Sequence, residues 1–246
     1  SVCRQRLALA VAVSAGASGT AEPAHIAILA MPEVTASVLY GLSDLLMGAG
    51  RDWPLVVEDR PGESALRVQI VSADGQPLTV ANGVPVVPHA ALADVPAPQV
   101  ICIPEVFVLP SADLRGRFEA EVAWLRQAHA GGAVIATACS GALLMAEAGL
   151  LDGEDATTHW AYCDALAQRH PRIRLHRQRA LVTAGEGQRL VMAGGGTSWQ
   201  DLGLYLIARL VSLEVAMQMA RIYLIDWHDS GQQPFARLSA SRQSDD

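Results

Sequence analysis

The sequence predicts a single α/β domain, in which a mostly parallel sheet lies between two layers of helices. Short apolar runs alternate with helix-length segments, which is the pattern of a parallel sheet covered by helices. Two of these runs, His25–Ala30 and Gln99–Ile103, are apolar along almost their whole length, as strands buried on both faces are. The 246 residues are 51% hydrophobic, and no Pro/Gly/Ser-rich linker interrupts the middle of the chain. One substantial core is therefore expected.

The individual elements follow from periodicity and from capping residues. The expected strands are 25–30, 66–71, 78–80, 84–86, 99–103, 133–136, 172–175, 180–183 and 190–192, with 78–80 and 84–86 forming an edge hairpin. The expected helices are 35–47, 113–129, 142–148, 162–169, 198–211 and 213–227. Gly48 and Gly50 end the first helix, Ser111 with Asp113 can cap the second, and Pro171 stops the fourth.

Three regions are expected along the chain: an extension over 1–23, the folded domain over 24–228, and a polar tail over 229–246. The apolar run Leu7–Val13 follows two arginines and imitates the start of a signal peptide, but it can equally be a helical extension. It is too short and too rich in alanine to predict a membrane span. A cytoplasmic location is therefore expected.

Composition argues against several classes of protein. The net charge is −7 with scattered arginines, which does not favour nucleic-acid binding by this chain itself. The cysteines at 3, 102, 139 and 163 lack a CxxC spacing, and the histidines lack a metal-ligand spacing. We therefore expect no metal, no cofactor and no disulfide framework, in a reducing compartment.

The segment Thr137–Ala142 carries the chemistry that is most specific in this sequence. It joins the apolar strand at 133–136 to an apolar helix, with Cys139 at the turn and the small Gly141 two places later. A nucleophile on a sharp strand-to-helix turn needs such a small residue, so that the helix can pack closely. The helix N-terminus is expected to lower the pKa of the thiol. His159 lies about twenty residues later, in a short strand-like segment over 156–160, and is a candidate base or substrate-orienting group.

These residues resemble the ThiJ/PfpI superfamily, which has the flavodoxin-like class I glutamine amidotransferase fold. More narrowly, the chain is similar to the sensor domain at the N-terminus of many AraC-type transcriptional regulators. The motifs that carry the resemblance stand in order at Ala146–Gly153, Ala156–Trp160, Gly194–Asp201 and Gln232–Phe235. The resemblance implies a homodimer that binds a small molecule and contacts DNA only through a C-terminal helix-turn-helix module. This chain ends about where that module would begin.

Two positions depart from the pattern of the superfamily. Val38 stands where the first helix usually carries an acid beside the cysteine, and Glu105-Val106 replaces the usual glycines after the central strand. Glu105 is a candidate substitute for the missing carboxylate, although it can also cap the next helix or point to water. The candidate catalytic residues are therefore Cys139, His159 and Glu105. The candidate ligand-binding residues are Ser140, Gly141, Val106 and Val38.

Two functions are expected from these observations. The first is a ligand-sensing domain of an AraC-type regulator whose catalysis is lost or reduced, because Val38 cannot supply the usual acid. Small amides, amines or carnitine-like metabolites are the ligands that the resemblance suggests. The alternative is a stand-alone cysteine-dependent hydrolase or hydratase acting on a small amide, isonitrile or aldehyde. Whether the chain is an enzyme is left open, with the balance against it.

Overall fold

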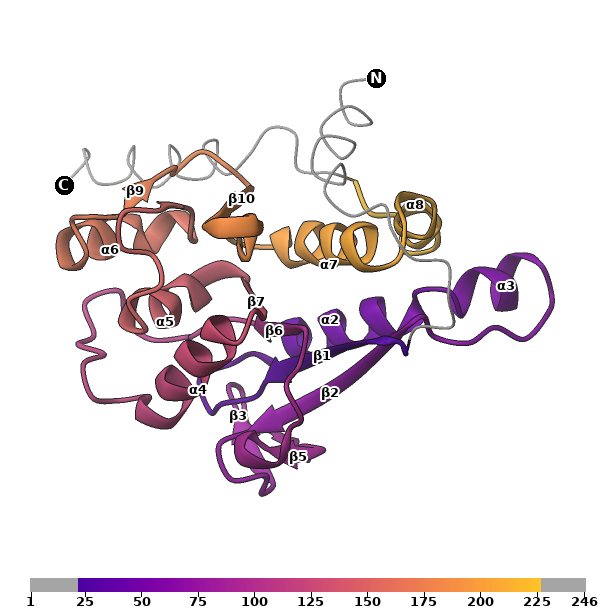
Figure 1. The fold of residues 1–246 in the computed structure, drawn as a ribbon, viewed down its shortest axis with the longest axis horizontal. Coiled ribbons are helices and arrows are strands. Elements are labelled where there is room, and N and C mark those ends of the chain that lie inside the picture. The colour runs from indigo at the N-terminus through magenta and orange to yellow at the C-terminus, as the bar shows by residue number, and fades with distance from the viewer. Residues whose placement is uncertain (1–21, 227–246) are drawn as a thin grey trace.

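A computed structural model describes residues 22–226 of the chain, and its elements are labelled in Figure 1. The strands are β1 (Ala24–Leu29), β2 (Leu66–Ser72), β3 (Leu78–Val80), β4 (Val84–Val86), β5 (Ala90–Ala91), β6 (Val100–Ile103), β7 (Val134–Thr137), β8 (Asp155–Ala156), β9 (Arg174–Leu175), β10 (Leu181–Ala184) and β11 (Leu190–Ala193). The helices are α2 (Ala36–Gly48), α3 (Asp52–Val57), α4 (Glu119–Ala130), α5 (Ala142–Glu147), α6 (Cys163–Arg169), α7 (Ser198–Leu210) and α8 (Leu213–Ile222).

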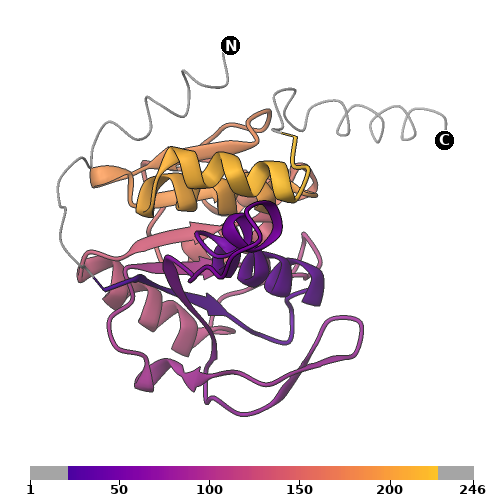
Figure 2. The same ribbon diagram turned by 90° about the vertical axis from the view of Figure 1, so that its right-hand side faces the viewer.

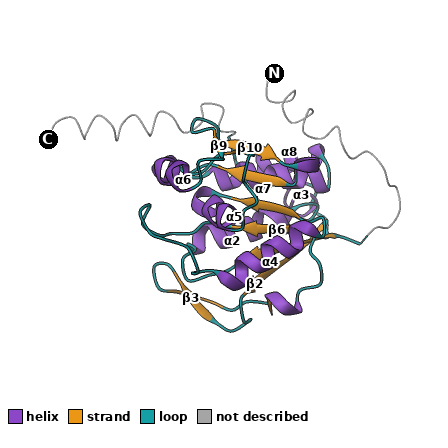
Figure 3. Ribbon diagram, turned by 60° about the vertical axis from the view of Figure 1, so that its left-hand side comes forward, coloured by secondary structure: helices purple, strands orange, loops and turns teal. Residues whose placement is uncertain are grey.

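A seven-stranded sheet forms the centre, in the order β10-β11-β7-β6-β1-β2-β5. Its strands pair in parallel, except that β10 and β11 are antiparallel. Helices lie on both sides of this sheet (Figures 1 and 3). The predicted fold class, a mostly parallel sheet between helical layers, is confirmed.

The order of the strands explains which helices share a face. The crossover through α2 leads from β1 to β2, whereas the crossover through α4 leads from β6 to β7 in the opposite direction along the sheet. Because such crossovers are right-handed, α2 and α4 lie on opposite faces. α7 packs against α2, α8 packs against α7, and α5 packs against α4. Figure 2 shows α8 in front of α7, with α2 and α3 below them.

The central strands are buried because both of their faces are covered. Every residue of β6, β7 and β11 is buried, as their apolar sequences predict, and the one polar residue among them is Thr137 at the end of β7. Parallel strands end at the same edge of the sheet, so the loops that follow β1, β6 and β7 meet there. These loops carry Thr35, Glu105 and Cys139 respectively. In folds of this kind, that edge is where ligands bind.

The second of the predicted helices, α4, begins later than expected. α4 starts at Glu119, with Phe118 as its N-cap, so Ser111 and Asp113 do not cap it. Asp113 instead accepts hydrogen bonds from the backbone N–H and the guanidinium of Arg115, at 3.1 and 2.9 Å. Short acidic side chains often bond the backbone two residues on, and this local turn competes with helix formation.

Other elements also differ from the prediction. The hairpin β3–β4 forms a sheet of its own instead of an edge of the main sheet, and β8 pairs with β9 in a third sheet. The short helix α3 was not predicted, because Pro54 and the β-branched Val56 and Val57 do not suggest a helix. α8 ends at Ile222, and Leu224 then adopts a φ of +52°. Residues 1–21 of the expected N-terminal extension, which include Cys3, lie outside the described residues, as does the motif at 232–235.

Candidate functional site

Cys139 lies in the tight turn between β7 and α5. This turn is a short 3-10 segment, Cys139–Gly141, and Cys139 has a φ of +52°. A positive φ is uncommon for a residue with a side chain, and such strained positions cluster at functional sites. The backbone is held on both sides, because the N–H of Cys139 donates to Gly194 (2.9 Å) and its carbonyl accepts from the hydroxyl of Thr158 (2.9 Å). The backbone of the half-buried Cys139 is therefore held in one place.

Gly141 allows the turn to pack against the strands below it. A Cβ atom built at Gly141 would overlap the hydroxyl oxygen of Thr137 and approach the carbonyl oxygen of Ile103 to 3.0 Å. The residue is buried and has a φ of −60°, so space rather than backbone conformation requires glycine here. This geometry agrees with the small residue that the sequence predicts two places after Cys139. It places Gly141 beneath the turn, where it contributes to packing.

Glu105 is a buried carboxylate at this site, with only 6% of its surface exposed. It follows the end of β6, and its Oε1 accepts hydrogen bonds from the backbone N–H of Thr35 (3.0 Å) and from the Thr35 hydroxyl. The alternative in which Glu105 points to water is therefore wrong. Nor does Glu105 cap the helix that follows it; its carboxylate meets the start of α2 instead. Val38 is also buried, in the first turn of α2.

The pKa of the Cys139 thiol is raised, whereas the sequence predicted that the helix N-terminus would lower it. Burial is the largest cause that raises this pKa, and with the negative charge of Glu105 and a hydrogen bond between the thiol and Glu105 it brings the value to about 12. The backbone N–H of Ser140 acts in the other direction, as the helix-terminus argument requires, but it is outweighed. The helix that follows has only six residues, so it adds little to the field at the sulfur.

The hydroxyl of Ser140 makes two hydrogen bonds with the backbone of Val106. The N–H of Val106 donates to Oγ of Ser140 (3.1 Å), and this hydroxyl donates to the carbonyl oxygen of Val106 (2.7 Å). Both residues are fully buried. The loop N–H that could have stabilised an oxyanion is therefore already bonded to a side chain.

His159 lies next to Cys139, but not in the way that a general base requires. Its backbone N–H donates to the carbonyl of Cys139 (3.3 Å), and its Nδ1 accepts from the N–H of Ala161 (3.1 Å). Burial lowers the pKa of the ring. A neutral ring that accepts at Nδ1 carries its proton on Nε2, so His159 presents a donor. His159 stands on a turn rather than on the predicted strand, and its ring covers Gly195, where a Cβ would overlap Cδ2.

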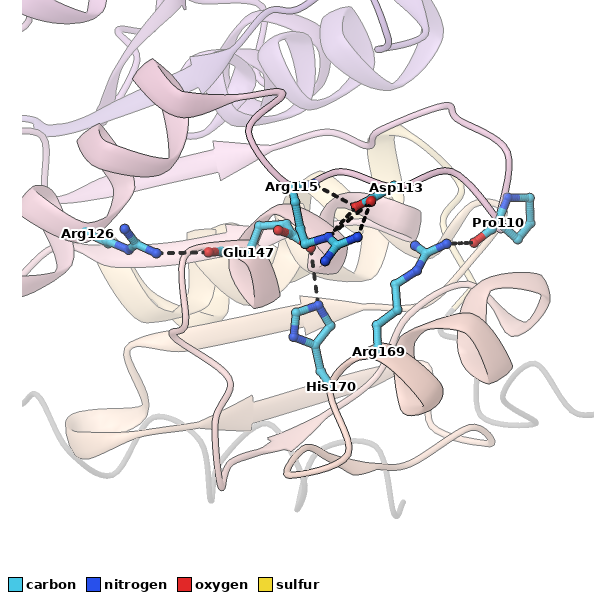
Figure 4. A network of polar contacts seen from close by, with 7 residues as sticks. All are labelled: Pro110, Asp113, Arg115, Arg126, Glu147, Arg169 and His170. Atoms are coloured by element: carbon cyan, nitrogen blue, oxygen red, sulfur yellow. Dashed lines mark hydrogen bonds and ion pairs between the residues drawn. The ribbon is translucent and has the colours of Figure 1, made fainter.

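The loop from Pro104 to Phe118 is anchored around this site. Its Val108 carbonyl accepts a hydrogen bond from the hydroxyl of Tyr162 (2.6 Å), and its Pro110 carbonyl accepts one from Arg169 of α6 (2.8 Å). Figure 4 shows Arg169 reaching Pro110, close to the pair of Asp113 and Arg115.

The same figure shows Glu147, at the end of α5, between Arg126 and His170. Arg126 donates to the carbonyl of Glu147 (3.0 Å), and the carboxylate of Glu147 lies 3.3 Å from Nε2 of His170. These contacts join α4, α5 and α6 beside the loop.

Sequence reasoning missed two residues of this site, Thr35 and Tyr162. Thr35 could have been noticed, because a threonine directly before a helix commonly caps it. Its hydroxyl makes no cap bond within the helix and bonds Glu105 instead. Tyr162 gave no signal, since its contact with Val108 joins residues 54 positions apart.

Residues 22–226 offer neither a metal site nor a membrane-spanning helix. In this range no group of three His, Cys, Asp or Glu side chains could hold a metal ion. None of the helices described there is both long and apolar enough to cross a membrane. Cys102 and Cys163 are free and buried. Burial raises the pKa of Cys102 to about 12 and that of Cys163 to about 11.

The chain is similar to curated proteins of two kinds. The HTH-type transcriptional regulator CdhR of Pseudomonas aeruginosa is 31% identical over 172 residues, which are 70% of this chain and 49% of the regulator. The isonitrile hydratase of Pseudomonas putida is 31% identical over 162 residues, which are 65% of each protein. The matched part thus spans about half the length of the regulator.

Solved structures and the family match agree with the fold. The crystal structure of an AraC family transcriptional regulator from Pseudomonas putida superposes with a TM-score of 0.65 at 18% identity, covering 82% of this chain and all of that one. This likeness shows a shared fold. Residues 56–191 match the DJ-1/PfpI family, which is more than half of the 246 residues. The predicted ThiJ/PfpI resemblance is thereby confirmed, and this chain belongs to the DJ-1/PfpI family.

Proposed function

We propose that this chain is the ligand-sensing domain of an AraC-type transcriptional regulator, and that it binds its ligand at the Cys139 site with little or no catalysis. The observation that carries this proposal is the environment of the Cys139 thiol. Burial and the Glu105 carboxylate raise its pKa to about 12. A thiol attacks a carbon centre only as thiolate, so this environment disfavours covalent catalysis at neutral pH.

Three further observations support binding over catalysis. The N–H of Val106 is taken up by Ser140, so it does not serve as a free oxyanion donor. His159 carries its proton on Nε2 and is therefore a donor where a base would be needed. The acid expected on the first helix is replaced by the apolar Val38. Each of these features weakens a step that a cysteine hydrolase requires.

The ligand should be a small polar molecule that can use these groups. The Nε2–H of His159 is a donor, and the Glu105 carboxylate is an acceptor. A small amide, an amine or a carnitine-like metabolite offers matching groups. The regulators among the relatives support a DNA-binding module on a further part of the protein. In this proposal the sensor forms a homodimer, and DNA is contacted only through that module.

The isonitrile hydratase among the relatives supports the alternative of a hydratase. Its identity to this chain equals that of the regulator, over almost as many residues. The alternative requires the thiolate that the observed environment disfavours. A sensor should therefore bind a ligand without turnover, whereas a hydratase should convert its substrate.

The test compares binding with turnover on the same protein. The melting temperature is measured with acetamide, glutamine and carnitine as probes, and turnover is followed by NMR with an alkyl isonitrile and with the same amides. We expect at least one probe to raise the melting temperature without any product. A probe at about 100 times its Kd stabilises the fold by about 2.7 kcal/mol, which is readily seen.

Two variants make the outcome specific to the site. Glu105→Gln is expected to abolish the rise in melting temperature. Glu58→Gln is the control, because it makes the same exchange at an exposed carboxylate that follows α3, outside the site, and should leave binding unchanged. Turnover by the unmodified protein that is lost in Cys139→Ala would instead establish the hydratase or hydrolase.

A further inference from the structure

We propose that Gly195 is a positioning residue for the ligand site: it leaves the space in which the His159 ring lies, and thereby fixes the direction from which this ring meets a ligand. The inference rests on the proposed function, in which His159 donates a hydrogen bond to the ligand. Gly195 lies in the turn between β11 and α7, on a different segment of the chain from His159.

Two glycines of this turn are required for different reasons. Gly196 has a φ of +64°, and a Cβ built there would have no other atom within 4 Å, so backbone conformation favours glycine at this position. Gly195 does not have a positive φ. A Cβ built at Gly195 would overlap Cδ2 of His159 and lie 2.9 Å from its Nε2, and its three nearest atoms all belong to this ring. Space for one side chain of the site is therefore what requires glycine here.

The backbone of the turn is held in place, so it cannot easily move aside. The N–H of Gly194 donates to the carbonyl of Ala180 (2.8 Å), and the carbonyl of Gly194 accepts from the N–H of Cys139 (2.9 Å). The carbonyl of Gly195 accepts from the hydroxyl of the buried Ser198 (2.8 Å). A methyl group added to the turn would therefore displace the imidazole ring rather than the backbone.

The other contacts of the His159 ring fix its orientation. Its Nδ1 accepts from the N–H of Ala161 (3.1 Å). The ring centroids of Trp160 and Tyr162 lie 5.2 and 6.0 Å away, and Tyr162 meets the ring edge-on at 85°. A half-turn about χ2 would bring Cδ2 to the N–H of Ala161 and lose this hydrogen bond. Ala161 thus determines which nitrogen is left for a ligand, and Gly195 allows the ring to stay where this bond forms.

The consequence of losing this space follows from the position of the ring. A displaced ring loses its bond to the N–H of Ala161, and the proton of the neutral imidazole can then lie on either nitrogen. Burial lowers the pKa of the His159 ring, so a more exposed ring should have a pKa closer to 6.5. Gly195→Ala should therefore remove the oriented donor while the histidine itself is kept.

The test is NMR of the ring nitrogens in isotopically labelled protein, which reports the position of the proton and, over a pH series, the pKa of each ring. The signals of His159 are those that disappear in His159→Ala. In the unmodified protein we expect the proton on Nε2 and a pKa below 6.5. In Gly195→Ala we expect a mixture of the two tautomers and a pKa closer to 6.5.

Gly196→Ala is the matched control in the same turn. It strains a backbone with positive φ but meets no neighbouring atom, so it should lower the melting temperature and leave the tautomer and the pKa of His159 unchanged. A merely structural role of the turn would move both variants alike. The proposal is overturned if Gly195→Ala keeps the tautomer and pKa of the unmodified protein, or if Gly196→Ala changes them equally.

A double variant shows whether the effect passes through the ring. Gly195→Ala alone should lower the melting temperature by about 2–12 °C, as overpacking in a domain of this size does. In the His159→Ala background the ring is absent, so the same change should cause little further loss. Should Gly195→Ala alone fail to melt cooperatively, the double variant should recover a cooperative transition, and failure to recover would contradict the proposal.

These outcomes are separate from those of the proposed function. A probe that raises the melting temperature of the unmodified protein should no longer do so in Gly195→Ala. Undiminished probe binding by Gly195→Ala would remove the role of Gly195 and leave the sensor. Turnover by the unmodified protein would remove the sensor, while the NMR comparison would still decide whether Gly195 positions the ring.

Discussion

The hydroxyl of Ser140 makes both of its hydrogen bonds to the backbone of one residue, Val106. Because both residues are fully buried, Ser140→Ala would leave a backbone N–H and a carbonyl without this partner. We expect the free energy of unfolding to fall by about 1–3 kcal/mol. Urea unfolding measures this change. The control is Ser37→Ala, at an exposed serine, whose free energy of unfolding should differ from that of the unmodified protein by no more than about 0.5 kcal/mol. A loss in Ser140→Ala no larger than in this control would contradict the account.

The sequence predicted which residues form the site, but not their protonation states. The sequence singled out Cys139, Glu105 and His159, and the structure brings all three to one edge of the sheet. Their chemistry depends on contacts that no local pattern encodes. The pKa of Cys139 depends on burial and on a carboxylate 34 positions away, and the proton position on His159 depends on the N–H of Ala161. A helix N-terminus was visible in the sequence, but the stronger opposing effects were not.

At the scale of elements, the turn between β7 and α5 depends on Gly141. A Cβ there would overlap the hydroxyl of Thr137 and crowd the backbone of Ile103, so neither a rotamer change nor a small shift removes both contacts easily. We expect Gly141→Ala to lower the free energy of unfolding by about 1–3 kcal/mol, as overpacking does. Thermal or urea unfolding measures this loss.

Gly131→Ala is the matched control for this change. Gly131 also has a negative φ, −77°, but it is exposed and its nearest neighbours lie 3.4 Å or more from an added Cβ. The free energy of unfolding of the Gly131→Ala variant should differ from that of the unmodified protein by no more than about 0.5 kcal/mol. Equal losses in the two variants would show that the close packing beneath the turn is not what requires glycine.

Long apolar patterns predicted the elements well, and short polar segments did not. The strands β1, β6, β7 and β11 are apolar except for His25 and Thr137, because both faces of the sheet are covered there, and this leaves a clear pattern in the sequence. The start of α4 was misjudged because Asp113 bonds Arg115 locally instead of capping the helix. The pairing of the hairpin β3–β4 with Thr35 depends on tertiary contacts, so its place outside the main sheet could not be read from its residues.

At the scale of the whole molecule, three histidines link stability to pH. Burial lowers the pKa of His25, His129 and His159 below the ordinary value of 6.5, with nearby arginines adding to the effect at the first two. The unfolded chain therefore binds more protons than the folded one as the pH falls. The stability that these neutral rings contribute is present above pH 6.5 and is lost as the pH falls through the folded-state values.

The melting temperature should accordingly fall between about pH 7.5 and about pH 5.5. Calorimetry at fixed ionic strength measures it. Asp113 and Asp155 have lowered pKa values, so their loss of charge belongs to a more acidic range and does not interfere. A variant combining His25→Gln, His129→Gln and His159→Gln should show a flatter profile. A melting temperature that is constant or rises on acidification would contradict this expectation.

The central claim is that Cys139 is held as a protonated thiol in a site built for binding. The measurement that tests it most directly is the alkylation rate of Cys139 in the unmodified protein from about pH 6 to about pH 10. The account predicts a rate that is still rising at the upper end of this range, because burial and Glu105 raise the pKa of the thiol to about 12. A rate that levels off at or below the ordinary thiol value of ~8.5 would show an available thiolate and contradict the account.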